Sequence, residues 1–198
     1  MLIKPGKKML YHAALTGYPS SGKSEIGKML ADRAGYKHVS TDMIRGELLT
    51  GKSVFKLEPP EWNLIFSELQ VRKHLYIREG KNVATDSCPH EKKSRRATLH
   101  VSPLLGDYLK EKNRELMRYL IVLYVDGKEL ERRNEGKGRT DQRSRDVMEW
   151  FGEAWREPPE DIMDEYGRVP VLRYENNTRR EQKLILKDLG KYLAVELL

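Results

Sequence analysis

The stretch GYPSSGKS at residues 17–24 matches the pattern G-x-x-x-x-G-K-[ST] at every fixed position. The apolar segment 12–16 leads into it and predicts a short strand. Beyond the stretch, apolar residues between 26 and 34 recur at helical spacing and predict a helix. A strand, a glycine-containing turn and a helix in this order begin a βαβ unit. This context argues against a chance match to the pattern, and it sets the fold of the whole chain.

Each fixed position of the stretch has a chemical reason. The two glycines let the backbone curve so that successive N–H groups point at a bound anion, and the helix start adds its positive end. Lys23 offers a cation to the β- and γ-phosphates, and the Ser24 hydroxyl is a ligand for Mg²⁺. We therefore predict a P-loop that binds ATP with Mg²⁺, with Ser24 as the metal ligand. Its predicted ATP-binding residues are Gly17, Tyr18, Pro19, Ser20, Ser21, Gly22, Lys23 and Ser24.

The rest of the chain alternates between strand and helix patterns. Further strands are expected at 37–39, 83–85, 119–125 and 169–174. Helices are expected from Thr41 to Gly46 or Gly51, over 59–80, over 99–117 with a break near Pro103, around 147–155, and after a Thr178/Glu181 capping box. This alternation predicts a single α/β domain over residues 1–198, with a doubly wound, mostly parallel sheet. A basic stretch follows at about 128–145.

Composition limits the partners and the compartment. A formal charge of +7 and a pI near 9.3 favour an anionic partner, with nucleic acid as the leading candidate and a merely solubilising surface as an equal alternative. The apolar runs are too short for a membrane span, which needs about 20 residues. The single cysteine, Cys88, excludes an internal disulfide and is typical of a reducing interior. We expect a cytoplasmic protein, of unknown oligomeric state, that does not bind membranes.

Three further motifs narrow the class of P-loop protein. The guanine-reading N-K-x-D pattern of GTPases is absent from the sequence, and helicases and motors need a longer chain. The first is a D-x-x-R element formed by Asp42 and Arg45. The second is Thr85-Asp86-Ser87 with the pair Arg95-Arg96 after it. The third is ELERRN at 129–134, followed by Lys137 and Arg139. Over roughly residues 11–190, these motifs resemble the polynucleotide-kinase-like branch of P-loop kinases, which also contains zeta-toxin-like and tRNA-modifying kinases.

The resemblance implies a role for each matched residue. Asp42 would be the general base for the acceptor hydroxyl; its alternative role is helix capping. Acceptor binding would fall to Arg45, Asp86 and Arg96, although Arg45 could instead be a solvated arginine. Asp86 could instead orient Asp42 or a Mg²⁺-bound water, or be a strand-end turn residue. The basic segment at about 128–145 would be the family's lid. The catalytic cations would be Lys23 and the lid residues Arg133 and Arg139, and Arg133 and Lys137 would help to bind ATP. The five histidines, His12, His38, His74, His90 and His100, lack metal-ligand spacing and are expected in packing or at the surface.

The leading functional hypothesis is an ATP-dependent polynucleotide 5′-hydroxyl kinase that acts on DNA or RNA in nucleic acid repair. The enzymatic alternative is a kinase for a small hydroxylated metabolite, a nucleoside or an aminoacyl-tRNA. A non-catalytic ATP-binding regulatory module is the alternative outside the enzymes. The sequence alone leaves the identity of the phosphate acceptor open.

Overall fold

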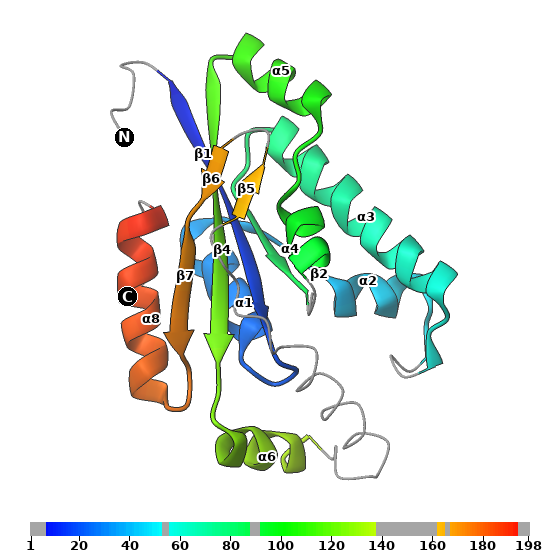
Figure 1. Cartoon of the computed structure of the whole chain (residues 1–198), viewed down its shortest axis with the longest axis vertical. Helices are drawn as coiled ribbons and strands as arrows, with labels where there is room; N and C mark the ends of the chain where they lie inside the picture. Colours follow the sequence, from blue (N-terminus) through cyan, green and yellow to red (C-terminus); the bar gives the residue numbers. More distant parts are fainter. Residues whose placement is uncertain (1–6, 53–55, 88–91, 138–161, 165–166, 194–198) are drawn as a thin grey trace.

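A five-stranded parallel sheet organises the chain in the order β2-β3-β1-β4-β7 (Figure 1). The computed structural model describes residues 7–52, 56–87, 92–137, 162–164 and 167–193. The strands are β1 (Lys8–Gly17), β2 (Lys37–Ser40), β3 (Val83–Asp86), β4 (Arg114–Tyr124) and β7 (Val171–Glu175). Because all five run the same way, their carboxyl ends meet at the lower edge of the sheet in Figure 1. Helices cover both faces, so the predicted doubly wound α/β fold is confirmed.

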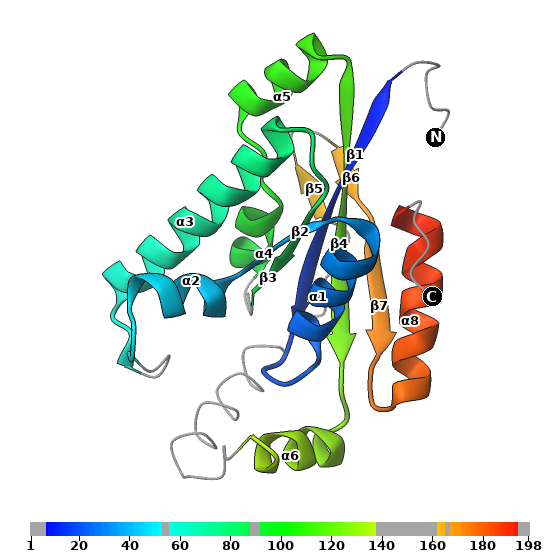
Figure 2. The same ribbon diagram turned by 180° about the vertical axis from the view of Figure 1, so that it is seen from behind.

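In the described part of the chain the helices form two layers around the sheet, apart from α6, which lies beyond the carboxyl ends of the strands (Figures 1 and 2). They are α1 (Lys23–Ala34), α2 (Thr41–Leu48), α3 (Pro59–Arg78), α4 (Lys92–Leu99), α5 (Pro103–Glu111), α6 (Gly127–Glu135) and α8 (Arg179–Leu193). Apolar residues of α1 and α8 share one core with β1 and β4, including Ile26, Leu30, Ile185 and Leu189. Residues of α3 and α5 share a second core on the opposite face. Alternation along β1 separates the two cores, since Ala13 and Leu15 face the first and Leu10 faces the second.

The predicted broken helix over 99–117 is wrong in its second half. Proline begins a new helix at Pro103, as expected at a first helical position, but α5 ends at Glu111. Residues 114–118 instead begin β4, which pairs with β1 from Lys8 onward. Residues 114–117 are only partly buried and Arg118 is a buried charge, so this mixed stretch lacks the apolar run that identified the rest of the strand.

The strand expected near the C-terminus also needs correction. The strand expected over 169–174 is split at Pro170, which cannot donate a ladder hydrogen bond. Its first residue, Val169, instead ends β6 (Gly167–Val169), which pairs in antiparallel fashion with β5 (Ile162–Asp164). Its second half is β7, an edge strand of the main sheet. The helix expected around 147–155 lies outside the described residues.

The helix ends follow local chemistry. Ser40 caps α2 by accepting a hydrogen bond from the Asp42 N–H at 3.2 Å, and α2 continues through Gly46. The predicted capping box of α8 is confirmed, because Thr178 Oγ1 accepts from the Glu181 N–H at 3.2 Å and Glu181 accepts from the Thr178 N–H at 2.7 Å. Among the described residues, a helix that combines the length and apolarity needed to cross a membrane is not found.

Lys73 is a fully buried cation on α3 that ties this helix to the end of α4. Its ammonium group donates to the Thr98 carbonyl at 2.9 Å and to the His100 carbonyl at 2.6 Å. Burial, together with the nearby charge of Arg118, lowers the pKa of Lys73 to about 7. In the unfolded chain this amine would regain the usual lysine pKa near ~10.4.

Stability should therefore rise with pH above neutrality. Between the two pKa values of Lys73 the unfolded chain binds more protons than the folded chain. Unfolding therefore becomes less favourable as pH rises. We expect the free energy of unfolding of the wild type, relative to Lys73→Met, to grow by roughly 1 kcal/mol per pH unit above pH 7. Urea unfolding between about pH 7 and pH 9 measures it, with the exposed Lys81→Met as control. A difference that stays constant over this range would contradict the prediction.

Candidate active site

The P-loop lies at the carboxyl end of β1 and leads directly into α1. Gly22 caps α1 with φ of 94°, a conformation that favours glycine, and a Cβ at this position would collide with the amide nitrogen of Asn176. Lys23 is 8% exposed and donates hydrogen bonds to the carbonyls of Gly17 at 2.9 Å and Tyr18 at 2.7 Å. The loop is therefore already curved around the lysine that is expected to meet the phosphates.

Ser24 and Asp86 are brought together from two elements. Parallel pairing places Asp86 beside Leu15 of β1 and Ser40 of β2, at the carboxyl edge of the sheet. Its Oδ2 atom accepts a hydrogen bond from Ser24 Oγ at 2.5 Å, and the Asp86 residue is 3% exposed. The structure thus places Asp86 beside the predicted metal ligand, although the sequence assigned it to the acceptor.

A hydroxyl and a carboxylate are oxygen donors of the kind that Mg²⁺ prefers. Within the described part of the chain, groups of three or more His, Cys, Asp or Glu able to hold a metal are not found. Magnesium commonly uses one or two carboxylates, with water and substrate phosphates completing its shell. Ser24 and Asp86 therefore fit a Mg²⁺ ion that arrives with a nucleotide.

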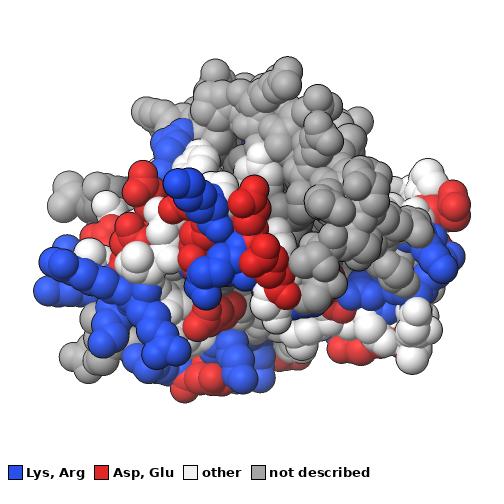
Figure 3. Space-filling view, turned by 90° about the horizontal axis from the view of Figure 1, so that it is seen from below, with Lys and Arg blue, Asp and Glu red and all other residues white. Residues whose placement is uncertain are grey.

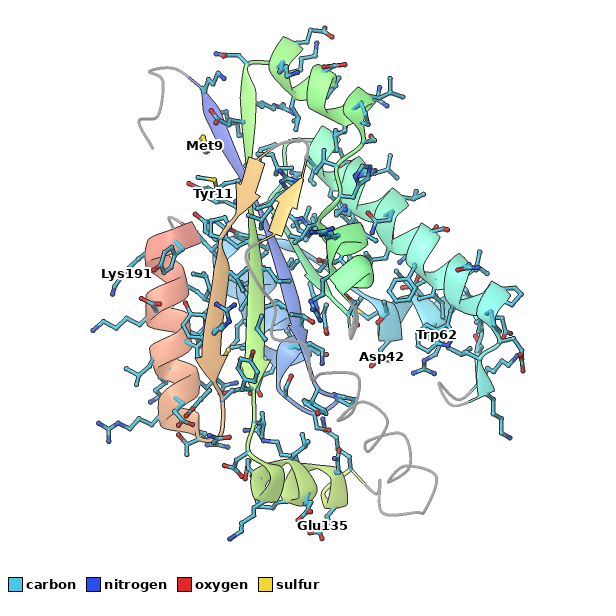
Figure 4. The ribbon with its side chains drawn as sticks, in the orientation of Figure 1. Met9, Tyr11, Asp42, Trp62, Glu135 and Lys191 are labelled. Atoms are coloured by element: carbon cyan, nitrogen blue, oxygen red, sulfur yellow. The ribbon has the colours of Figure 1, made fainter. Side chains whose placement is uncertain are left out.

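Asp42 and Arg45 form a pair on the first turns of α2. The Asp42 side chain is 67% exposed, and its Oδ1 atom lies 3.5 Å from an Arg45 guanidinium nitrogen. Figure 4 shows Asp42 at the start of α2, on the same lower side of the molecule as the P-loop. Ser40 supplies the side-chain cap of this helix, and Asp42 is the acidic residue of its first turn, where its charge also complements the helix dipole. Arg45 also donates to the Lys52 carbonyl at 2.8 Å.

The first part of the predicted lid, α6, is fixed to the outer side of the P-loop. Arg133 donates to the Ser20 carbonyl at 3.2 Å and to the Asn176 carbonyl at 2.6 Å. Asn134 accepts a hydrogen bond from Ser20 Oγ at 2.7 Å. Ser20 has φ of 68°, which is uncommon for a residue with a side chain, and these contacts support it. Here Arg133 therefore connects α6 to the loop and to the turn after β7.

Asn134 and Asn176 are site residues that sequence reasoning missed. Asn176 donates from its side-chain amide to the Ser21 carbonyl at 2.8 Å, and is 2% exposed. The sequence marks Asn176 only by its place shortly after a predicted strand. Residues that follow the strands of a parallel sheet lie at the edge where ligands bind. Asn134 lies inside the quoted ELERRN motif but was given no role.

Charges over α6 are mixed rather than uniformly basic. Figure 3 views the molecule from the side of α6 and shows blue and red side chains side by side there. Arg132 and Arg133 both pair with Glu129 at 2.7 Å. Hydrogen bonds from these two arginines lower the pKa of Glu129 to about 2. The basic charge of this segment is therefore partly neutralised within the helix itself.

The other predicted residues are less closely associated with the loop. Arg96 is exposed on α4, whereas its neighbour Arg95 is 1% exposed. Lys137 is exposed and donates to Ser20 Oγ at 3.4 Å. Arg139 and the lid beyond residue 137 lie outside the described residues.

The contacts of Arg133 predict a large difference between two adjacent arginines. We expect Arg133→Ala to lower the free energy of unfolding by about 1.5–3 kcal/mol, because it removes charged hydrogen bonds and leaves carbonyls unsatisfied. Its matched control is Arg132→Ala, which removes a side chain that is 72% exposed and paired with Glu129. We expect no measurable change there. Equal unfolding midpoints in urea for the two variants would show that Arg133 does not hold the loop.

Comparisons with known proteins agree with this geometry. The AAA domain family matches residues 14–166. A shikimate kinase of Chlorobium phaeobacteroides is 40% identical over 57 residues, which cover 29% of this chain and 30% of that protein. The match thus spans less than a third of that relative's length.

Solved structures show the same fold at low identity. A gluconokinase from Sinorhizobium meliloti has a TM-score of 0.57 and 15% identity, covering 95% of this chain and 98% of that chain. A fungal RNA kinase has a TM-score of 0.59 and 15% identity, covering 93% of this chain and 86% of that chain. Because the family match extends over well more than half of the chain, this protein belongs to the AAA domain family, with a P-loop kinase fold.

Proposed function

We propose that this protein transfers the γ-phosphate of ATP to the 5′-hydroxyl of a DNA or RNA strand. The observation that carries the proposal is the exposed Asp42 carboxylate paired with Arg45 on the same side of the sheet as the P-loop. A hydroxyl becomes a better nucleophile when a carboxylate accepts its proton during attack, and a guanidinium can hold a nearby phosphate. Because the Asp42 side chain is 67% exposed, the end of a polymer can reach it.

The loop residues would do the electrostatic work of the transfer. Lys23 would exchange its two carbonyl partners for phosphate oxygens, and the P-loop N–H groups would hold the phosphate chain. Ser24 and Asp86 would hold Mg²⁺, which neutralises charge that develops on the phosphates. Asp42 would take the proton of the attacking hydroxyl, and Arg45 would position the acceptor phosphate.

The lid segment would supply further positive charge around the phosphates. Arg133 already contacts the loop backbone, and Lys137 approaches Ser20 Oγ, so both are placed to respond when phosphates occupy the loop. We propose that Arg133 maintains the loop and that Lys137 and Arg139 contribute positive charge toward the phosphates. Arg96, exposed on α4, would add a phosphate contact for the acceptor.

A second candidate is supported by one comparison. The segment of 57 residues that is 40% identical to a shikimate kinase favours a small hydroxylated metabolite as acceptor. The net charge of +7 favours the polynucleotide instead, because distributed Lys and Arg bind phosphate backbones.

Radiolabel transfer separates these functions. The protein is incubated with γ-labelled ATP and Mg²⁺, and with 5′-hydroxyl DNA, 5′-hydroxyl RNA or a panel of hydroxylated metabolites that includes shikimate and gluconate. Label on an oligonucleotide 5′ end, lost when that end already carries phosphate, supports the proposal. Label on a metabolite alone supports the second candidate. Acceptor-independent ATP turnover that persists in Asp42→Ala would indicate a regulatory ATP-binding module.

A further inference from the structure

His38 lies next to the Asp86 carboxylate, which accepts a hydrogen bond from Ser24. Its Nε2 atom is 3.7 Å from Asp86 Oδ2, the same oxygen that accepts the Ser24 hydroxyl. The His38 side chain is 12% exposed and that of Asp86 is 4% exposed. Nε2 is buried and has no hydrogen-bond partner among the described residues. A buried polar atom without a partner is unusual, so its position beside a carboxylate requires an explanation.

The strand pairing explains why these side chains share one face. His38 pairs with Ala84, two residues before the pairing of Ser40 with Asp86, so His38 and Asp86 project to the same side of the sheet. Ala84 belongs to the core beneath α1. His38 therefore lies between the sheet and α1, and Ser24 reaches the same carboxylate from the first turn of that helix.

Gly27 makes room for the imidazole. A Cβ at Gly27 would lie 2.6 Å from His38 Cδ2 and 3.0 Å from Cε1, and closer still to Nε2. Glycine inside a helix costs about 1 kcal/mol relative to alanine. The helix thus carries an unfavourable residue at the position that lets the ring approach Asp86.

We infer that His38 is a positioning residue for the Mg²⁺–nucleotide site, acting through Asp86. This inference rests on the proposed binding of Mg²⁺ and nucleotide at Ser24 and Asp86. Because a carboxylate only accepts hydrogen bonds, the His38 proton facing it is on Nε2. The ring lies against Oδ2 at 3.7 Å and limits where this oxygen can move, while Ser24 donates to the same oxygen. Partners of metal-ligating carboxylates act in this way, and losing one typically costs about 10–100-fold in metal affinity or activity.

Isothermal titration with ADP, with Mg²⁺ or with a chelator, tests the inference without turnover. The readout is the ratio of the two Kd values, because a variant that merely loosens the fold weakens both affinities alike. For His38→Leu we expect the Mg²⁺-dependent gain in affinity to fall about 10-fold or more. His38→Gln, which can place an amide N–H near the Nε2 position, should restore most of the gain. Gly27→Ala should reduce it, because the methyl group displaces the ring.

His12→Leu is the matched control. His12 is also a buried strand histidine, but its Nε2 atom lies 2.9 Å from Thr85 Oγ1. This variant should keep the wild-type ratio even if its thermal stability falls. If His38→Leu fails to fold, Gly27→Ala and His38→Gln still give the comparison.

The outcomes separate the inference from the proposed function. If the wild type binds ADP with no dependence on Mg²⁺, both are wrong. If the wild type depends on Mg²⁺ and both His38→Leu and Gly27→Ala keep the full dependence, only the role of His38 is wrong. Equal losses in the presence and absence of Mg²⁺ would make His38 a packing residue and overturn the inference.

Discussion

Replacing Asp42 by asparagine should lower kcat for phosphoryl transfer by roughly 10²–10⁴-fold, the usual contribution of a general base. Asparagine keeps the shape of the side chain but cannot accept the acceptor's proton. The affinity for ATP should stay unchanged, because Asp42 is exposed on α2 and is hydrogen-bonded to Arg45 at 3.5 Å, not to the P-loop. Single-turnover transfer and ATP titration measure the two quantities separately.

The matched control for this variant is Glu47→Gln on the same helix. Glu47 is 50% exposed and pairs with Arg72 at 2.6 Å, outside the proposed acceptor site. Its loss should leave kcat unchanged. A similar fall in kcat for both variants would mean that α2 acts through its overall charge, and that Asp42 is not the base.

Lys23→Met should cause the second large loss, of roughly 10²–10³-fold or more in kcat/KM. The lysine is nearly buried, and its two carbonyl contacts show that its ammonium group already lies inside the curve of the loop. Methionine fills similar volume but carries no charge for the phosphates. Because Lys23 contacts bound nucleotide before and during transfer, we expect weaker ATP binding as well as slower chemistry.

Lys28→Met provides the comparison for Lys23→Met. Lys28 lies on the exposed side of the same helix, so its replacement removes one charge without touching the loop. Transfer assays on the two single variants should show normal activity for Lys28→Met and the large loss for Lys23→Met. Near-normal kcat/KM in Lys23→Met, with the fold intact by circular dichroism, would disprove the phosphate-binding role of the loop.

Much of the fold could be predicted because its signals are local. The loop motif predicted β1 and α1, and the apolar run at 119–125 predicted the centre of β4. The start of β4 was missed because residues 114–118 are mixed in polarity and gain their strand structure from pairing with β1. Such long-range pairing has no periodic signature in a single segment.

The site was less predictable for the same reason. Motif spacing placed Lys23, Ser24 and Asp42 at the carboxyl edge, but the partners of these residues come from distant segments. Asp86 was assigned to the acceptor because the sequence cannot show that its carboxylate faces Ser24. Asn176 contacts Ser21 across 155 positions of the chain, and no local pattern reports such a contact.

The contact between Asn176 and the P-loop also affects the order in which the protein can mature on the ribosome. Synthesis proceeds at about 5–20 residues per second, so the 155 positions that separate Ser21 from Asn176 take roughly 8–30 s to emerge. During this interval the nascent loop lacks the turn that supports its outer side, although β3 and β4 can already flank β1. Nucleotide capture should therefore be among the last properties the nascent chain acquires, and shortened translation products should contain most of the sheet without a finished phosphate site.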